Sequence, residues 1–324
     1  PRCLCRTDNW LTSPLRHQVC VIGLYDGGCL HRQRALAARR VCLAVYLVRF
    51  WHPQPAMSGS ECQWPGAFLI LARTARLRCL SVLENARMAH DVIPTPDVPR
   101  IPVAGGGSFP VHRIYCVGRN FADHAREMGI SAPASKAERG QPTFFMKPAD
   151  AIVVGHGDYI PYPPGTKELH HEVELVVALG SDARTGELPV EQAENLIYGY
   201  GVGLDLTRRD LQAAAKAKGL PWDIAKGFDY SAPISELVHA GEVGALEALN
   251  LSLEVNGQVR QQSLLDQMIW NVPEILHELS KLYALRAGDL IFMGTPAGVG
   301  PLLPGDHFSA RLENVAERHG IIAD

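Results

Sequence analysis

The chain has 324 residues, of which 47% are apolar, and a mean hydropathy of −0.02. These values are typical of a soluble globular protein with one large domain or two ordinary ones. The formal net charge of −3 argues against a nucleic-acid partner, because such partners are usually bound through a clear excess of Lys and Arg.

The first 87 residues differ in composition from the rest. They hold 12 Arg, no Lys and 4 acidic residues, whereas residues 88–324 hold 19 basic and 30 acidic residues. Seven of the eight cysteines also lie in this first segment, and neither a helical nor a strand period persists there. We interpret residues 1–87 as an extension that is disordered or not part of the native fold. Residues 88–324, with Met88 as a natural start, form the expected catalytic domain.

Other interpretations of residues 1–87 are weaker. The segment is basic and poor in acids like a transit peptide, but it is long and rich in Trp and Cys. Its apolar run 41–48 is far shorter than the ~18 residues of a membrane span. Cys3 and Cys5 have no second pair at zinc-finger spacing. With only Cys116 remaining, residues 88–324 fit a reducing cytoplasm.

The sequence after residue 112 predicts many short strands and three helices. The first helix is expected to begin at Asn120 as N-cap and to stop at Gly129, and the second to run from Thr207 to Gly219. The third covers 271–283, with Ile275, Leu276, Leu279 and Leu282 facing inward. Strands are expected at 113–117, 144–147, 151–154, up to Gly180, and at 196–206, 251–255, 258–260 and 289–293.

Two turn signals refine this pattern. Asn256-Gly257 between two apolar runs predicts a β-hairpin. The alternate glycines of 199–203 predict a strand that another backbone approaches closely. Because strands and helices do not alternate as βαβ units, the fold class is mixed and mainly β.

Glu172 and Glu174 follow His170-His171 in an apolar strand. Successive side chains of a strand point to opposite faces, so both carboxylates share one face while Val173 and Leu175 share the other. The simplest interpretation is a polar face turned to water. A second interpretation is a site for Mg²⁺ or Mn²⁺, which would offset both the mutual repulsion and the desolvation of the two carboxylates.

Asp205 supplies a third carboxylate. It closes the strand 196–206 just before the second helix, so it is a candidate metal ligand. Three carboxylates would occupy half of an octahedral site and leave positions for water and substrate. From local sequence alone a helix-capping carboxylate is equally compatible.

His124 and Glu127 form a second candidate group. At i and i+3 they share one helix face, and a histidine oriented by a carboxylate can act as a general base near neutral pH. An exposed His–Glu pair on an amphipathic helix is the alternative.

Several further residues are candidates for substrate contacts. Arg209 and Gln212 share a face of the second helix, where Arg209 could hold a carboxylate in a bidentate manner; a solvated face, expected in any case for Arg208 and Lys216, is the alternative. Lys226 lies among small and apolar residues and is expected to be buried against an anion. Thr295, in a Gly- and Pro-bounded loop without a P-loop ending, could offer a hydroxyl.

Together these segments resemble the fumarylacetoacetate hydrolase family. The resemblance covers residues 110–320, and within the family it is strongest to acylpyruvate and fumarylpyruvate hydrolases. Phe121 departs from the tyrosine usual in relatives and removes a hydroxyl from that pocket wall. The matching segments are Ile114–Asn120, Phe145–Pro148, Leu169–Glu174, Gly203–Asp210, Gly219–Trp222 with Ala225-Lys226, and Gly294–Gly300.

The resemblance implies a β-sandwich roll, a homodimer and an enzyme of aromatic-compound catabolism, and the single cysteine of residues 88–324 places this enzyme in the cytoplasm. It implies Mg²⁺ or Mn²⁺ on the three carboxylates and water activation by His124 and Glu127. The expected reaction is hydrolysis of the C–C bond of a 2,4-diketo acid, such as fumarylpyruvate, with Lys226 stabilising the leaving enolate. A second substrate carboxylate would need a cation such as Arg119, Lys147 or one from the loop 131–141.

Two other functions remain open at this point. Oxaloacetate decarboxylation or hydroxydienedioate isomerisation and decarboxylation could use the same metal site, although the His124–Glu127 pair favours hydrolysis. A non-catalytic metal- or ligand-binding module is the alternative of another class. The complete set of candidate catalytic residues argues against it.

Overall fold

The computed structural model describes residues 92–324 except 130, 132, 134, 156–157 and 184–186. All of them belong to one compact unit, Asp91–Asp324. The expectations for residues 1–87 lie outside the described residues. In the described part of the chain, every helix is too short or too polar to cross a membrane.

A six-stranded sheet carries most of the chemistry-bearing segments. Its strand order is β12-β9-β8-β15-β3-β4, and all neighbours are antiparallel except β15 and β3. The neighbouring strands β8 and β9 pair Glu174 with Gly203 and Val173 with Leu204. The strands are β3 (Arg113–Gly118), β4 (Thr143–Lys147), β8 (Val173–Leu179), β9 (Ile197–Leu204), β12 (Val238–His239) and β15 (Asp289–Phe292).

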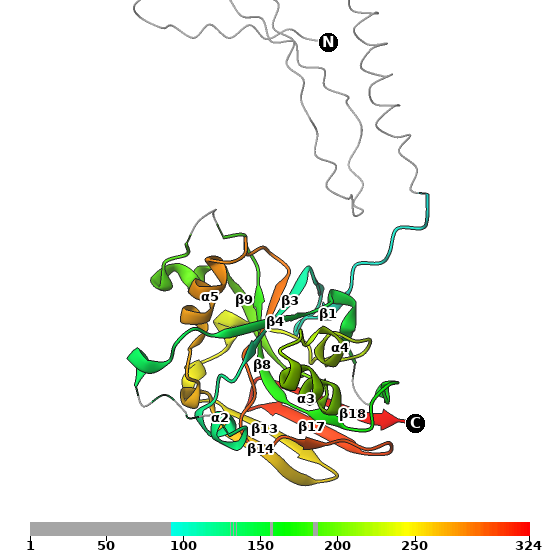
Figure 1. Ribbon diagram of the computed structural model, residues 1–324. Coiled ribbons are helices and arrows are strands. Elements are labelled where there is room, and N and C mark those ends of the chain that lie inside the picture. Colours follow the sequence, from blue (N-terminus) through cyan, green and yellow to red (C-terminus); the bar gives the residue numbers. More distant parts are fainter. Residues whose placement is uncertain (1–91, 130, 132, 134, 156–157, 184–186) are drawn as a thin grey trace, which may run out of the picture. The chain divides into compact units, whose positions relative to one another are not determined.

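A five-stranded sheet packs against it. Its order is β14-β13-β17-β18-β6, with only β18 and β6 parallel, and Figure 1 shows it below the six-stranded sheet. The predicted hairpin joins β13 to β14, and both Asn256 and Gly257 have positive φ, as such a turn requires. The strands are β6 (Asp158–Pro161), β13 (Asn250–Val255), β14 (Gln258–Leu264), β17 (His307–Leu312) and β18 (Ala316–Ala323).

Three small sheets complete the β structure of the part of the chain that the structure describes. The first pairs β7 with β10 and β16, the second joins β1 to β2, and the third joins β11 to β5. Their bounds are β1 (Arg100–Pro102), β2 (Ser108–Pro110), β5 (Ile152–Val153), β7 (Leu169–His171), β10 (Thr207–Arg208), β11 (Ala232–Pro233) and β16 (Gly300–Pro301).

The main core lies between the two large sheets. Leu175 and Val177 of β8 meet Leu253 of β13 and Phe308 of β17 in one buried cluster. The other face of β8, with Val176, belongs to a second cluster closed by β1 and β2. The mainly-β fold class is therefore confirmed. Because both faces of β8 are covered, the interpretation of its polar face as solvent-exposed is wrong.

Close approach of another backbone explains one of the predicted strand glycines. A Cβ added to Gly199 in β9 would lie 2.1 Å from the carbonyl oxygen of Val238 in β12. Any larger residue would therefore push the edge strand away from the sheet.

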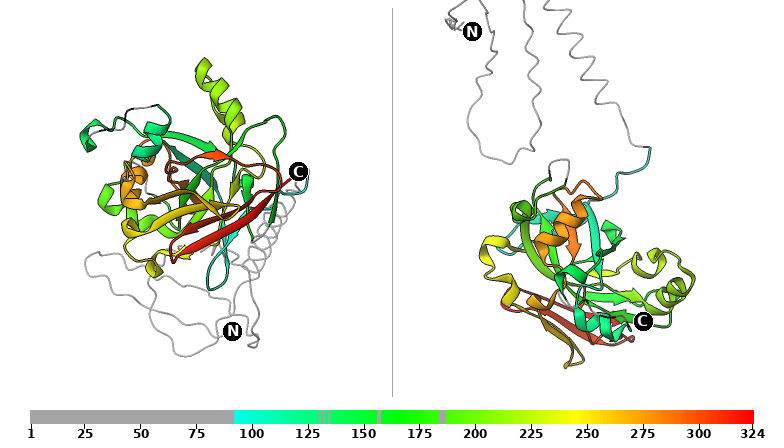
Figure 2. Two further views of the ribbon diagram at one scale, coloured as in Figure 1. Left: turned by 90° about the horizontal axis from the view of Figure 1, so that it is seen from below. Right: turned by 60° about the vertical axis from the view of Figure 1, so that its left-hand side comes forward.

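Within the described residues four short α-helices surround the sheets, and Figures 1 and 2 place α3 and α4 together, away from α5. The last of them, α5, begins with a capping box in which Asn271 and Glu274 exchange hydrogen bonds. The bounds are α2 (Ala122–Glu127), α3 (Arg209–Lys218), α4 (Asp223–Lys226) and α5 (Val272–Ser280), and short 3₁₀ turns include Val190–Leu196 beside α5.

Three local predictions are wrong. Asn120 does not cap α2; its side chain donates to the carbonyl oxygens of Trp270 and Met293 and so fastens two distant segments. Thr207 lies in β10 and α3 begins two residues later. Leu282, expected inward, lies beyond the end of α5 and is 64% exposed. The expected stop of α3 at Gly219 is confirmed by its left-handed conformation.

Candidate metal centre and active site

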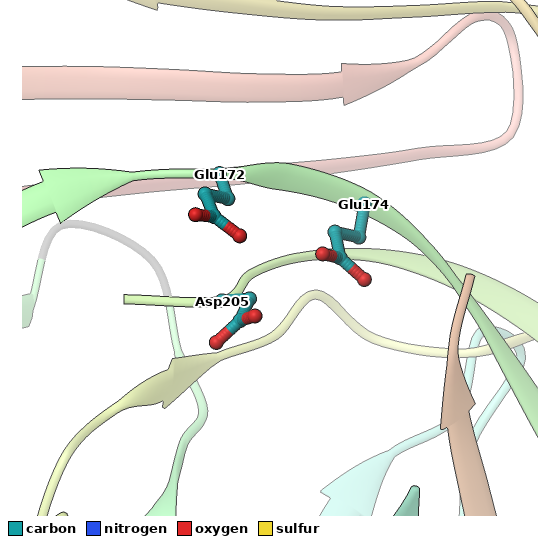
Figure 3. A group of neighbouring side chains, drawn as sticks. All are labelled: Glu172, Glu174 and Asp205. Carbon is teal, nitrogen blue, oxygen red and sulfur yellow. The ribbon is translucent and has the colours of Figure 1, made fainter. Parts of the chain in front are cut away.

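Three carboxylates come together where β8 and β9 adjoin the small sheet of β7, β10 and β16. They belong to Glu172, Glu174 and Asp205. Glu172 lies between β7 and β8, Glu174 on β8, and Asp205 directly after β9. Their ligand atoms all lie within 4.8 Å of one another, and Figure 3 shows the three carboxylates converging. The backbone N–H of Asp205 donates to the carbonyl oxygen of Glu172 at 2.8 Å. Sheet geometry therefore fixes the three carboxylates relative to one another.

Two of these carboxylates are paired with buried cations. The Nζ of Lys226 lies 2.8 Å from Glu172 Oε2 and also donates to Asp205. Lys147 Nζ lies 2.9 Å from Asp205 Oδ1, and Arg209 donates to Glu172 Oε1. Lys226 is thus buried against anions, as predicted. The alternative of Asp205 as a helix cap is wrong, because α3 has no side-chain cap.

Glu172 and Glu174 differ in their electrostatic surroundings. Burial opposes the ionisation of Glu172, but the cations of Lys226 and Arg209 outweigh burial and hold the pKa of this carboxyl well below its ordinary value. Burial, together with the negative charges of Asp205 and Glu172, raises the pKa of Glu174 well above its ordinary value. Among the described residues, Glu174 has no ion pair with Lys, Arg or His.

One backbone amide orients Glu174. The N–H of Gly294 donates to Glu174 Oε2 at 2.7 Å. Gly294 has φ +89°, and a Cβ there would lie 2.7 Å from the Cβ of Asn120. Both the conformation and the space require glycine. The loop after β15 can therefore approach the carboxylate only in this form.

The donor set fits a hard divalent cation. All three groups are carboxylates with at most 5% exposure, and oxygen ligands of this kind suit Mg²⁺ or Mn²⁺. The uncompensated Glu174 supports this fit, because a bound cation would stabilise its ionised form. Glu172, Glu174 and Asp205 could thus hold such an ion.

His124 and Glu127 form a pair on α2, close to these carboxylates. His124 Nδ1 lies 3.1 Å from Glu127 Oε2, and Glu127 in turn accepts from the backbone N–H of Gly298. His124 is only 6% exposed, so the alternative of an exposed pair does not hold for it. A carboxylate that accepts from Nδ1 leaves Nε2 able to take a proton.

One pocket is lined both by His124 and by the three carboxylates. It has about 390 Å³ of space, including its opening to solvent. The predicted substrate contacts Arg119, Arg209, Gln212 and Thr295 all line it. Its other lining residues are Val117, Gly118, His124, Met128, Phe145, Glu172, Glu174, Asp205, Lys216, Trp222 and Lys226.

The predicted contacts differ in how much of their polar surface is already engaged. Arg209 donates to Glu172 and, at 2.6 Å, to Gln212 Oε1, which leaves part of its five-donor guanidinium for a ligand. Gln212 and Thr295 are buried, and Arg119 is exposed with φ 61°.

Two residues are not where the sequence placed them. Lys147 was a candidate for the far end of the pocket, but its buried ammonium lies against Asp205 and donates to the carbonyl oxygens of Leu206 and Lys226. Phe121 is buried in the main core and does not line the pocket. The missing hydroxyl at Phe121 therefore changes the core and not the pocket wall.

Sequence reasoning missed Gln261. Its Oε1 accepts from the backbone N–H of Val173 and lies 2.9 Å from His171 Nδ1, while its Nε2 donates to Thr295 Oγ1 and the carbonyl of Pro296. The Gln261 side chain therefore joins the strand segment on either side of Glu172 to the loop after β15. A polar residue on a hairpin strand gives no local signal of such a role.

Sequence reasoning also misjudged Lys216, which was expected on a solvated face. It lines the pocket beside Trp222. The available signal was its spacing of seven residues from Arg209, which places both on one side of α3.

Known proteins share this fold and sequence. Residues 113–321 match the family described as fumarylacetoacetate (FAA) hydrolase C-terminal. A fumarylpyruvate hydrolase from Ralstonia sp is 45% identical over 175 residues, covering 54% of this chain and 89% of the relative. A mitochondrial oxaloacetate tautomerase of Arabidopsis thaliana is 41% identical over 206 residues, covering 63% of this chain and 88% of the relative.

A solved structure is similar over nearly its whole length. The crystal structure of fumarylpyruvate hydrolase from Pseudomonas aeruginosa, in complex with Mn²⁺ and pyruvate, has a TM-score of 0.68 and 42% identity. The match covers 72% of this chain and 99% of that one. On the strength of its matched residues and these relatives, the chain is an enzyme of the fumarylacetoacetate hydrolase family.

Proposed function

We propose that this enzyme hydrolyses the C3–C4 bond of a 2,4-diketo acid, with fumarylpyruvate as substrate and fumarate and pyruvate as products. The observation that carries the proposal is the His124–Glu127 pair, whose histidine lines the same pocket as the three carboxylates. A base that can activate water is needed for hydrolysis. The names of the relatives from Ralstonia and Pseudomonas aeruginosa agree with this choice.

Glu172, Glu174 and Asp205 would hold the metal, which we propose to be Mg²⁺ or Mn²⁺. When bound, the ion supplies positive charge that favours negative charge on the neighbouring oxygen atoms of the substrate. Mn²⁺ is named in the Pseudomonas aeruginosa relative. Lys226, which bridges Glu172 and Asp205, adds a fixed positive charge at the same place.

The chain's own residues orient the substrate and move the proton. Arg209 and Gln212 would hold the oxo-acid end, and the Thr295 hydroxyl, which accepts from Gln261, can donate to it. His124 Nε2 takes a proton from water while Glu127 stabilises the imidazolium. The water oxygen adds to C4, the C3–C4 bond breaks with its electron pair left on C3, and C3 takes the proton held by His124 to give pyruvate.

Action on oxaloacetate is the competing function, because relatives at 41% and 38% identity are named oxaloacetate tautomerase and oxaloacetate decarboxylase. Neither tautomerisation nor decarboxylation requires addition of water to a carbonyl. The two functions can therefore be distinguished by measuring whether the oxygen atom of labelled water enters the product.

The test uses the full chain with Mn²⁺ and three substrates: fumarylpyruvate, acetylpyruvate and oxaloacetate. We expect cleavage of the two acylpyruvates in ¹⁸O-labelled water, with one labelled oxygen in fumarate or acetate. His124→Gln should lower the rate at which labelled product forms by about 10²–10⁴-fold. Turnover of oxaloacetate with no cleavage of either acylpyruvate would overturn the proposal.

Three further expectations accompany the proposed function. We propose that the enzyme is a homodimer, that it acts in the cytoplasm, and that it serves the breakdown of aromatic compounds. We also propose that residues 88–324 are the catalytic domain and that residues 1–87 are dispensable. Removal of residues 1–87 with no loss of kcat would support the last point.

A further inference from the structure

Lys216 lies on the same side of α3 as two proposed substrate contacts. Arg209, Gln212 and Lys216 are spaced i, i+3 and i+7, so one helix face carries all three. All three line the pocket. At 1.5 Å per residue, Lys216 lies about 10 Å further along the helix than Arg209. The helix thus presents one cation beside the metal-binding carboxylates and another two turns away.

The ammonium of Lys216 is partly withdrawn from water. Its Nζ lies 5.1 Å from the ring centroid of Trp222. In the described part of the chain, no carboxylate forms an ion pair with Lys216. Burial, with the nearby charges of Arg209 and Arg119, lowers the pKa of Lys216 to about 8. The pocket therefore keeps a cation in surroundings that disfavour its charge.

A ligand carboxylate beside Lys216 would offset both the burial and the neighbouring positive charges, and so would stabilise the charged ammonium. An ammonium that is partly desolvated and near two guanidiniums gains more from an anion than an exposed lysine does. The other cations near the pocket are less suited. Lys147 and Lys226 are occupied by buried carboxylates, and Arg119 is exposed.

We propose that Lys216 receives the second carboxylate of the substrate and makes the enzyme selective for acyl groups that end in a carboxylate. This inference rests on the proposed function and adds the residue that distinguishes one acylpyruvate from another. Aromatic side chains support it, since the rings of Phe145 and Trp222, 5.9 Å apart, line the same pocket. Flat apolar walls of this kind suit a planar conjugated chain such as the fumaryl group.

The test compares two substrates that differ at the far end. Fumarylpyruvate has the second carboxylate and acetylpyruvate lacks it. For Lys216→Met we expect kcat/KM for fumarylpyruvate to fall by about ten- to a hundredfold, the effect of losing one charge-assisted hydrogen bond. The values for acetylpyruvate should stay unchanged. The matched control is Lys218→Met, an exposed lysine of the same helix, which should change neither substrate.

Each outcome separates this inference from the proposed function. If the wild type cleaves neither acylpyruvate, the proposed function fails. If the wild type cleaves both and Lys216→Met affects them equally or not at all, the role of Lys216 is overturned and the proposed function stands. Lys216→Arg retains a donor and should recover most of the selectivity. It also serves as the second variant should Lys216→Met not fold.

Discussion

Replacing Glu174 by Gln should change stability in opposite directions with and without metal. Gln has the same shape and can still accept the hydrogen bond from Gly294, but it carries no charge. In the metal-free protein the Glu174 carboxylate is buried beside Glu172 and Asp205, with no cation of its own among the described residues. Removing this charge should therefore stabilise the metal-free fold while removing one proposed metal ligand.

The magnitude follows from burial and from linkage. A buried charge without a cation of its own costs at least as much as an unsatisfied buried polar group, about 1–3 kcal/mol, so we expect metal-free Glu174→Gln to gain roughly this amount at pH 8. Mn²⁺ at about a hundred times its Kd should stabilise the wild type by ~2.7 kcal/mol. The variant should lose most of this increment. The order of stability should consequently invert between EDTA and Mn²⁺.

The pH dependence has a definite sign. The pKa of Glu174 is raised in the folded state. There is therefore a pH range in which the folded protein keeps the proton of this carboxyl and the unfolded chain has lost it. Wild-type stability in EDTA should then fall as pH rises above roughly 4.3, the ordinary value for Glu. Glu174→Gln lacks this titrating carboxyl, so the higher stability of the variant in EDTA should vanish at low pH. The opposite slope from the lowered pKa of Glu172 is present in both proteins.

Urea unfolding in EDTA and in Mn²⁺, at several pH values, measures these differences. The exposed Glu242, replaced by Gln, is the control for loss of one carboxylate and should behave like the wild type. A Glu174→Gln protein that is less stable in EDTA at pH 8, or that keeps the full stabilisation by Mn²⁺, would refute the reasoning.

Three further predictions concern the rest of the site. His124→Gln should lower kcat on acylpyruvates by about 10²–10⁴-fold while stabilisation by Mn²⁺ is unchanged; near-normal kcat would exclude it as the base. Lys226→Met should lower the free energy of unfolding in EDTA by about 3–5 kcal/mol, because two buried carboxylates lose their shared cation, and wild-type stability in urea would contradict this pairing. Gln261→Leu should lower the free energy of unfolding by about 1–3 kcal/mol. Because the variant also releases the Thr295 hydroxyl, it should raise KM more than it lowers kcat; unchanged steady-state kinetics would show that the loop needs no such support.

The parts of the site set by local periodicity could be predicted from the sequence. A strand period puts Glu172 and Glu174 on one face, and a helical spacing pairs His124 with Glu127. The structure contains both arrangements. The mainly-β fold class followed in the same way, because short apolar runs and turn residues leave little room for βαβ units.

Residues whose roles depend on distant segments could not be predicted. Asn120 matched a helix cap locally, but its side chain bonds to backbone 150 and 173 residues away. Gln261 is 90 residues from His171. Lys147 fits an exposed cation as well as a buried one until Asp205 is placed beside it. Strands β17 and β18 also lacked a recognised signal, since their pairing is visible only in the assembled sheet.

The loop that follows β15 has a consequence for how this enzyme can change over time. Its amides at Gly294 and Gly298 hold Glu174 and Glu127, one carboxylate from each half of the proposed machinery. Main-chain donors survive nearly every substitution, since only proline removes an N–H. Side chains elsewhere in the loop can therefore be replaced during evolution without changing the alignment of the two carboxylates. This alignment is vulnerable to any residue other than glycine at 294 or 298, since both have positive φ and a Cβ would lie 2.7 Å from the Cβ of Asn120 or 2.1 Å from the carbonyl oxygen of Arg260.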